Sequence, residues 1–239
     1  MRELGVVTRA LLGVARDGLD ERALAETICR ACVDGLDIDG ASISVLTATD
    51  ARETLCASDQ TADVLEELQY TLNEGPCVEA ATSGHPVLVP DVHDRTATAR
   101  WPVFASAIGE RTPVRALFAL PLRWGAINLG VLDMYRRAPG NLDDEQRRDA
   151  FSAADVAALL LLGQRTDPGG DEGWLESATA SRAEVHQATG MVLVQLGVSA
   201  PEALARLRAY AFSHGRLLID IARDVVARRI SFVEDVKEP

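Results

Sequence analysis

Two glycines divide the last part of the chain into helix-length segments. Gly197 and Gly215 each follow a stretch in which apolar residues recur at steps of three and four, the spacing of an amphipathic helix that ends at a glycine. Ser199 opens the middle segment and Glu202 follows three residues later, which is the pattern of a capping box. Residues 181–232 therefore predict a unit of three short helices, each with one buried face.

The first of these helices continues an apolar seam that begins further upstream. Its members are mostly small and follow one another at steps of four and three, as in a coiled coil. They are Trp174, Ala178, Ser181, Val185, Ala188 and Val192. Small side chains let two helices approach closely, so we expect this seam to help join two copies of the chain into a homodimer.

Charge is distributed unevenly along the sequence. The net charge is −12, but residues 174–239 hold eight basic and eight acidic residues, so the acidic excess lies entirely in residues 1–173. Within residues 181–232, seven arginines stand against four acidic residues. This local excess favours contact with phosphate in the helical unit alone. On charge alone, the alternative that these arginines only keep a small domain soluble is equally good.

The helical unit resembles the ANTAR domain, a three-helix module of bacterial transcription antiterminators that binds RNA. The resemblance is carried by Arg182 and Val185, the run from Ala188 to Met191, and then Ala203, Leu207, Ala211, Arg216 and Ala222. Thr189 departs from the pattern, because many members have a lysine there. The resemblance implies that the unit binds paired hairpins in a nascent transcript and so prevents a terminator from forming.

Seven residues of the helical unit are candidates for contact with RNA. RNA loops are recognised by phosphate contacts from arginine, and by stacking on bases and contacts to their edges. The candidates are Arg182, His186, Thr189, Gly190, Arg208, His214 and Arg216. Tyr210 is a further stacking candidate, although its place in the apolar stripe favours core packing.

A second interpretation is that the helical unit of a ligand-sensing regulator binds protein or DNA instead of RNA. Two short helices around Gly197 or Gly215 are compatible with a helix-turn-helix. Asp220 and Asp224 argue against DNA, because we expect both on the exposed side of the third helix, where they would repel phosphates. We also expect Asp224 to pair with Arg228, four residues later.

Helical and strand-like patterns alternate through the first two thirds of the chain. Helices are expected over 1–18, 20–35, 60–72 and 143–162, and two short helices are expected to begin at 77 and near 100. Strands are expected over 41–46, 52–57, 86–92, 114–122 and 127–135. This order predicts an α+β sensor domain with an antiparallel sheet flanked by helices. The sequence QRTDPGGDEG at 164–173 reads as a linker. We expect a sensor domain at 1–165, a linker at 166–173 and an all-α domain at 174–239.

Several short motifs in the sensor resemble the GAF domain as it occurs attached to ANTAR. They are the segment from Glu74 to Ala80, Val89–Asp91, Arg100–Pro102, Pro121–Leu122 and Gly130–Leu132. GAF domains bind many small molecules or none, so the resemblance implies a possible small-molecule sensor and leaves any ligand or cofactor unknown. The pocket candidates are Cys77, Asp91, Trp101 and Phe104. Trp101 and Phe104 share a helical face, so they either stack on a flat ligand or fill the core.

Catalytic and metal-binding patterns are missing from the sequence. Cys29 and Cys32 lie in an amphipathic helix without a second ligand pair, so core packing as reduced thiols is the better interpretation. A cluster of His85, Asp91, His93 and Asp94 is not expected to bind metal. Asp91 and His93 share a strand face, but His85 lies outside the strand and nothing fixes a third ligand. No nucleophile with an oriented base is visible, so we expect no enzyme.

The sequence also carries signals about the cellular compartment. Its longest apolar run, 156–162, is far too short to cross a bilayer, and the first residues do not follow the pattern of a secretory signal. We therefore expect a cytoplasmic protein that is not associated with a membrane.

Overall fold

The computed structural model describes residues 4–14, 19–46, 52–166 and 182–232, with side chains described to residue 164 in the third range. The chain divides into two compact units, residues 1–181 and 182–239, which we describe separately.

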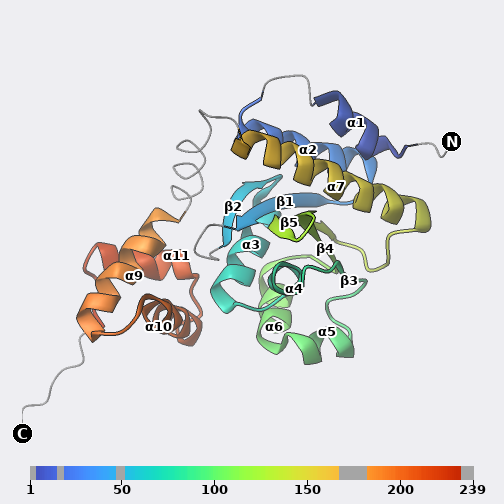
Figure 1. Ribbon diagram of the computed structural model, residues 1–239. Helices are drawn as coiled ribbons and strands as arrows, with labels where there is room; N and C mark the ends of the chain where they lie inside the picture. The colour runs from blue at the N-terminus through green and yellow to red at the C-terminus, as the bar shows by residue number, and fades with distance from the viewer. Residues whose placement is uncertain (1–3, 15–18, 47–51, 167–181, 233–239) are drawn as a thin grey trace, which may run out of the picture. The chain divides into compact units, whose positions relative to one another are not determined.

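The first unit is built on a five-stranded sheet in the order β2-β1-β5-β4-β3, in which every neighbouring pair is antiparallel (Figure 1). The strands are β1 (Gly40–Leu46), β2 (Arg52–Ala57), β3 (Val87–Val89), β4 (Ala116–Trp124) and β5 (Ile127–Arg136). The predicted α+β class is confirmed. β3 is shorter than the predicted strand, and Pro86 and Pro90, which cannot donate a ladder hydrogen bond, flank it.

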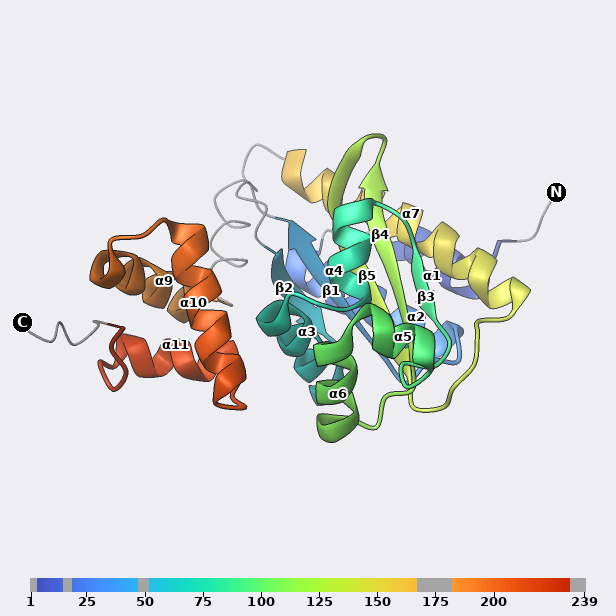
Figure 2. The same ribbon diagram turned by 90° about the horizontal axis from the view of Figure 1, so that it is seen from below.

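Helices cover both faces of the sheet (Figures 1 and 2). One layer contains α1 (Val6–Val14), α2 (Glu21–Gly35) and α7 (Asp144–Thr166). The opposite layer contains α3 (Gln60–Leu72), α4 (Pro76–Ser83), α5 (Arg95–Arg100) and α6 (Pro102–Arg111). The sequence pattern did not predict α5, which is only six residues long and begins where Asp94 caps the amide of Ala97.

The two faces of the sheet differ in chemistry. Toward α2 and α7, β1, β4 and β5 present apolar side chains such as Ile43, Phe118 and Leu132, which belong to the main hydrophobic core. Toward α3 and α4, the neighbouring positions on β1 and β5 are Ser42 and Asp133, which are paired across the ladder. The interior on this side of the sheet therefore contains polar groups.

Helical spacing in the sequence predicts that the apolar face of α7 is made by Phe151, Ala154, Ala158 and Leu161. Phe151 differs from this prediction, because 37% of its surface is exposed. The buried side is made instead by small residues, with Leu161 at its end: Ala150, Ala153, Ala154, Ala157, Ala158 and Leu161. Alanines let α1 and α2 pack close to α7, so the wider Phe151 lies at the rim.

The second unit is the predicted three-helix bundle. Its helices are α9 (Ala183–Leu196), α10 (Ala200–Ser213) and α11 (Leu218–Val226). The capping box of Ser199 and Glu202 is present, and Gly197 ends α9 in the left-handed conformation with φ 63°. The buried side chains come from all three helices: Val185, Ala188, Val192, Ala203, Leu207, Ala211, Leu218, Ile221, Ala222 and Val225.

The predicted intermolecular seam is wrong for its second half, Val185 to Val192. Val185, Ala188 and Val192 are at most 1% exposed in a single chain, because they pack against α10 and α11. The rest of the seam, Trp174 to Ser181, lies outside the described residues. A heptad-like stripe fits a three-helix core as well as a coiled coil, since both use the same helical repeat.

Within the described ranges, no single helix is long and apolar enough to cross a bilayer. Only α9 and α10 taken together meet the criteria of length and composition, and they are bent by 104° with respect to each other.

Candidate functional site

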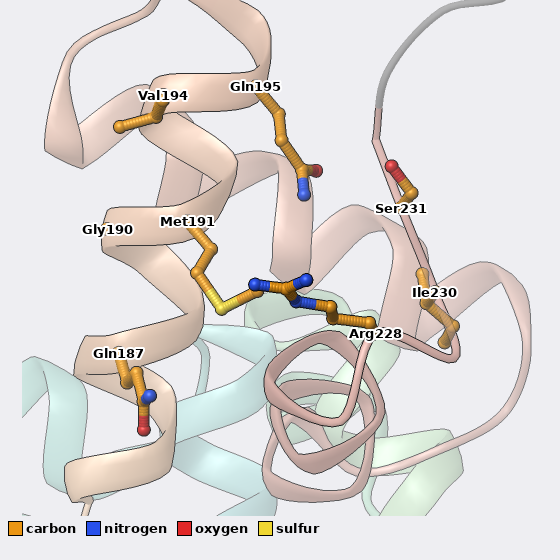
Figure 3. A pocket seen from close by; sticks show the side chains of 8 residues that line it. All are labelled: Gln187, Gly190, Met191, Val194, Gln195, Arg228, Ile230 and Ser231. Atoms are coloured by element: carbon orange, nitrogen blue, oxygen red, sulfur yellow. The ribbon is translucent and has the colours of Figure 1, made fainter.

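A surface groove runs along α9 of the helical unit (Figure 3). It has a volume of about 560 Å³. One wall comes from α9 and the other from the chain that follows α11. Its lining residues are Gln187, Gly190, Met191, Val194, Gln195, Arg228, Ile230 and Ser231. We call it the α9 groove.

The segment after α11 is held in place by backbone geometry and one side chain of α9. Arg228 adopts φ 58°, which turns the chain sharply after the helix. The backbone N–H of Arg229 then donates to the carbonyl of Asp224 at 2.7 Å. The N–H of Phe232 donates to Gln195 Oε1 at 2.8 Å and so ties the segment to α9. The groove is therefore a defined part of the fold.

The chemistry of the groove is mixed. Met191, Val194 and Ile230 supply apolar surface, and Val194 is 77% exposed. The guanidinium of Arg228 reaches toward Met191, and the amide of Gln195 points into the same space (Figure 3). An apolar wall with amides and one cation suits an unpaired base, because a base offers a flat face, polar edges and a linked phosphate.

The predicted RNA-binding residues are dispersed over the helical unit, and the groove contains only Gly190 among them. His186 is exposed on α9, and Arg208 is half-buried on α10. The hydroxyl of Thr189 donates to the carbonyl of Val185 at 2.7 Å. Arg182 is only 3% exposed at the start of α9.

His214 and Tyr210 form a stacked pair on α10 and its cap. Their ring centroids are 4.0 Å apart at 18°, and Phe232 packs at 5.2 Å from the tyrosine ring. Tyr210 was interpreted as a core residue, but it is half-buried and lies at the edge of the bundle. The stack forms because residues four apart on a helix face the same side.

The predicted pair of Asp224 and Arg228 is wrong. Asp224 instead binds Arg216 at 2.7 Å and Arg229 at 2.5 Å. Hydrogen bonds from these two guanidinium groups lower the pKa of the Asp224 carboxyl. The helix ends at Val226, so Arg228 no longer follows the spacing that would bring it over Asp224. Arg228 faces the α9 groove instead.

The sensor residues proposed for a ligand pocket have different surroundings in the fold. Cys77 is fully buried at the start of α4 and lies 3.4 Å from the hydroxyl of Ser44. Phe104 and Trp101 are 1% and 7% exposed, so both rings fill the interior. Asp91 forms an ion pair with Arg115 at 2.6 Å, and this hydrogen bond lowers the pKa of its carboxyl. Whether any of them binds a ligand remains a prediction.

A buried polar cluster lies where α3 and α4 meet the sheet. Cys77 is joined there by Glu66 and Gln69 from α3, Arg52 from β2 and Asp133 from β5. Burial, and then the charge of Glu66, raise the pKa of Asp133 well above its usual range. This cluster was not predicted from the sequence. The only sequence signal for it was Asp133, an acidic residue in the mostly apolar strand β5.

The chain thus combines an α+β unit with a small helical unit that has an exposed groove. A model of the GAF domain family matches residues 18–164, and a model of the ANTAR domain matches residues 174–226. The first match alone spans more than half of the chain, which therefore belongs to the GAF domain family and carries a C-terminal ANTAR domain. Both resemblances seen in the sequence are confirmed, and the domain architecture is that of a regulator.

Solved structures support the fold of the sensor. The GAF domain of a phosphoenolpyruvate-protein phosphotransferase from Coxiella burnetii is 13% identical, with a TM-score of 0.54, and the match covers 71% of this chain and 95% of that chain. The corresponding Acinetobacter domain is 11% identical, with a TM-score of 0.51, and the match covers 66% and 92%. Such low identity shows the fold alone. No curated protein is significantly similar to the chain.

Proposed function

We propose that the protein is an RNA-binding transcription antiterminator rather than an enzyme. The ANTAR domain binds hairpins in nascent RNA, the α9 groove receives an unpaired base, and the GAF domain acts as the sensor. The match to the ANTAR domain supports an RNA partner. The arginine excess of residues 181–232 supports contact with phosphate.

The position of Gly190 is the single observation that supports RNA binding in the α9 groove. It lies inside α9, where a glycine costs about 1 kcal/mol of helix stability relative to alanine. A Cβ at this position would meet nothing within 4 Å, so packing within the protein does not require a glycine. A glycine that the fold does not need and that lines an exposed groove is explained by the close approach of a ligand.

The Gly190→Ala variant should separate stability from binding. We expect the helical unit to become more stable by about 1 kcal/mol, because alanine is the better helix former. We expect affinity for a two-hairpin RNA to fall about tenfold, because the new methyl group displaces the base by its own thickness. Chemical denaturation and a gel-shift titration measure the two effects. Equal affinity in the more stable variant would exclude close approach at this residue.

Arg228→Ala tests the charge of the groove. We expect weaker RNA binding and a salt slope reduced by about 0.7 to 0.9, the value for one lost phosphate contact. Arg22→Ala is the matched control, because Arg22 is an exposed arginine on α2 of the sensor, with 67% of its side chain accessible. RNA titrations at several salt concentrations give the salt slope of each variant. Identical slopes for both variants would mean that Arg228 does not contact RNA.

A comparison of nucleic acids tests the function itself. We expect the full chain to shift a two-hairpin RNA at protein concentrations that leave duplex DNA of equal length unshifted. Preference for the DNA, or failure to bind either at low salt, would favour the alternative of a regulator that acts on DNA or protein.

We further propose that the protein acts in the cytoplasm as a homodimer, because paired hairpins require two ANTAR domains. The buried α9 seam is not available for pairing. Exposed apolar side chains on α1 and α7 support a contact in the sensor layer instead: Val6 at 60%, Leu12 at 48% and Leu159 at 45%.

A further inference from the structure

Three potential ligand side chains converge in the interior of the sensor. Glu66 comes from α3, Cys77 from the first turn of α4 and Asp133 from β5. Each offers one ligand atom, and these atoms lie within 4.8 Å of one another. The three residues are 1%, 0% and 7% exposed. Elements distant in sequence thus bring two carboxylates and a thiol to one enclosed point.

Each of these side chains is oriented by a neighbouring polar group. The hydroxyl of Ser42 donates to Glu66 Oε1 at 2.8 Å. Gln69 Nε2 donates to Asp133 Oδ2 at 3.0 Å, and Gln69 Oε1 accepts from the backbone N–H of Cys77 at 2.8 Å. The hydroxyl of Ser44 lies 3.4 Å from Cys77 Sγ. Metal ligands in proteins are held by such outer hydrogen bonds, which fix their direction.

One oxygen of the cluster has no hydrogen-bond donor. Glu66 Oε2 is buried and makes no hydrogen bond within the described structure, whereas Oε1 of the same carboxylate is bound by Ser42. A buried acceptor without a donor costs free energy unless something else satisfies it. The carboxylate that carries it belongs to the converging set, so either a cation at this point or a proton shared with the Asp133 carboxyl would supply the missing interaction.

Arg52 is the cation beside this cluster, and its charge acts on both Cys77 and Asp133. Burial outweighs this charge and raises the pKa of both groups, which favours their protonated forms when no metal is bound. A divalent ion would bind by displacing these protons, because metal ligands coordinate in their deprotonated form.

We propose that Glu66, Cys77 and Asp133 bind one divalent metal ion of the zinc class. A thiolate beside two carboxylates selects zinc or a similar transition ion over magnesium and calcium, which prefer ligand sets made of oxygen alone. Three protein ligands leave one position of a tetrahedral ion for a water molecule or a small ligand. This site is independent of RNA binding by the ANTAR domain.

Cobalt substitution tests the site in the full chain, prepared without a histidine tag. The protein is treated with a chelator, dialysed and titrated with Co²⁺, whose bond to a thiolate gives a charge-transfer absorption. We expect saturation at one ion per chain and displacement of cobalt by Zn²⁺. A folded wild-type protein that binds no stoichiometric ion would overturn the proposal.

Cysteine variants identify the ligand. Cys77→Ser should abolish the charge-transfer band, whereas Cys32→Ser should keep it, because Cys32 is buried in the hydrophobic core between α2 and the opposite face of the sheet. Zn²⁺ should raise the Tm of the wild type and of Cys32→Ser, but not that of Cys77→Ser. An undiminished band in Cys77→Ser would place the metal elsewhere.

Glu66→Gln provides a variant that keeps the cysteine and nearly the same shape. We expect it to weaken Co²⁺ affinity at least tenfold while the circular dichroism spectrum is unchanged. Equal affinity would exclude Glu66 as a ligand and favour two carboxyl groups that share a proton.

Discussion

Gly130→Ala is expected to destabilise the sensor domain by about 3 kcal/mol, or to prevent its folding. A Cβ at Gly130 would lie 2.1 Å from the backbone oxygen of Ser44 and 2.9 Å from Val45 Cα. These atoms belong to β1, which pairs with β5 at the centre of the sheet. Backbone of a central strand cannot rotate away as a side chain does, so relief requires the two strands to separate and lose hydrogen bonds.

Denaturant unfolding followed by circular dichroism measures this effect. Gly13→Ala is the matched control, since Gly13 lies in α1 and a Cβ there would meet nothing within 4 Å. We expect the control to be neutral or more stable by up to about 1 kcal/mol. A loss below about 1 kcal/mol for Gly130→Ala would show that β1 and β5 can move apart at little cost.

Asp149→Ala is expected to lower the free energy of unfolding by about 3 kcal/mol. Asp149 is a residue of α7 that is 6% exposed. Its carboxylate binds backbone N–H groups in the first turn of α1, which have no partner within the helix. Its carboxylate accepts hydrogen bonds from the N–H groups of Val7 at 2.9 Å and Thr8 at 3.0 Å, and from the Thr8 hydroxyl at 2.6 Å. Alanine would leave these donors without an acceptor in a buried position.

Asp155→Ala is the control for this change, because Asp155 is an exposed acidic residue on the same helix. Unfolding free energies should separate the two variants, and hydrogen exchange should show faster opening of α1 in Asp149→Ala alone. Equal stability of the two variants would mean that α1 is not held by this carboxylate.

Much of the secondary structure could be predicted from the sequence. Helix α3 and strand β2 occupy the predicted residues, and the predicted capping box at Ser199 is formed. These features depend on residues only a few positions apart, so they can be recognised directly in the sequence. Burial was harder to predict, since Phe151 has the spacing of a core residue but lies at the rim of α7.

The candidate sites were only partly predictable. Gly190 was identified from its motif, whereas the rest of the α9 groove was missed, because its second wall depends on a turn after α11 and a hydrogen bond to Gln195. The seam of Val185 was assigned to a partner, although it fills the core of the same unit. Periodicity shows that a face is apolar, but it does not show which surface covers it.

The two-domain organisation, the family of each domain, and most of the helices and strands could be recognised from the sequence. Local spacing and capping produce these features, so they can be recognised without coordinates. The packing of the folded chain was needed to show that Glu66, Cys77 and Asp133 meet in one buried cluster, and that Arg228 faces α9 instead of Asp224. Gln69 and Asp133 are 64 residues apart, and only the packing of α3 on the sheet brings them into contact.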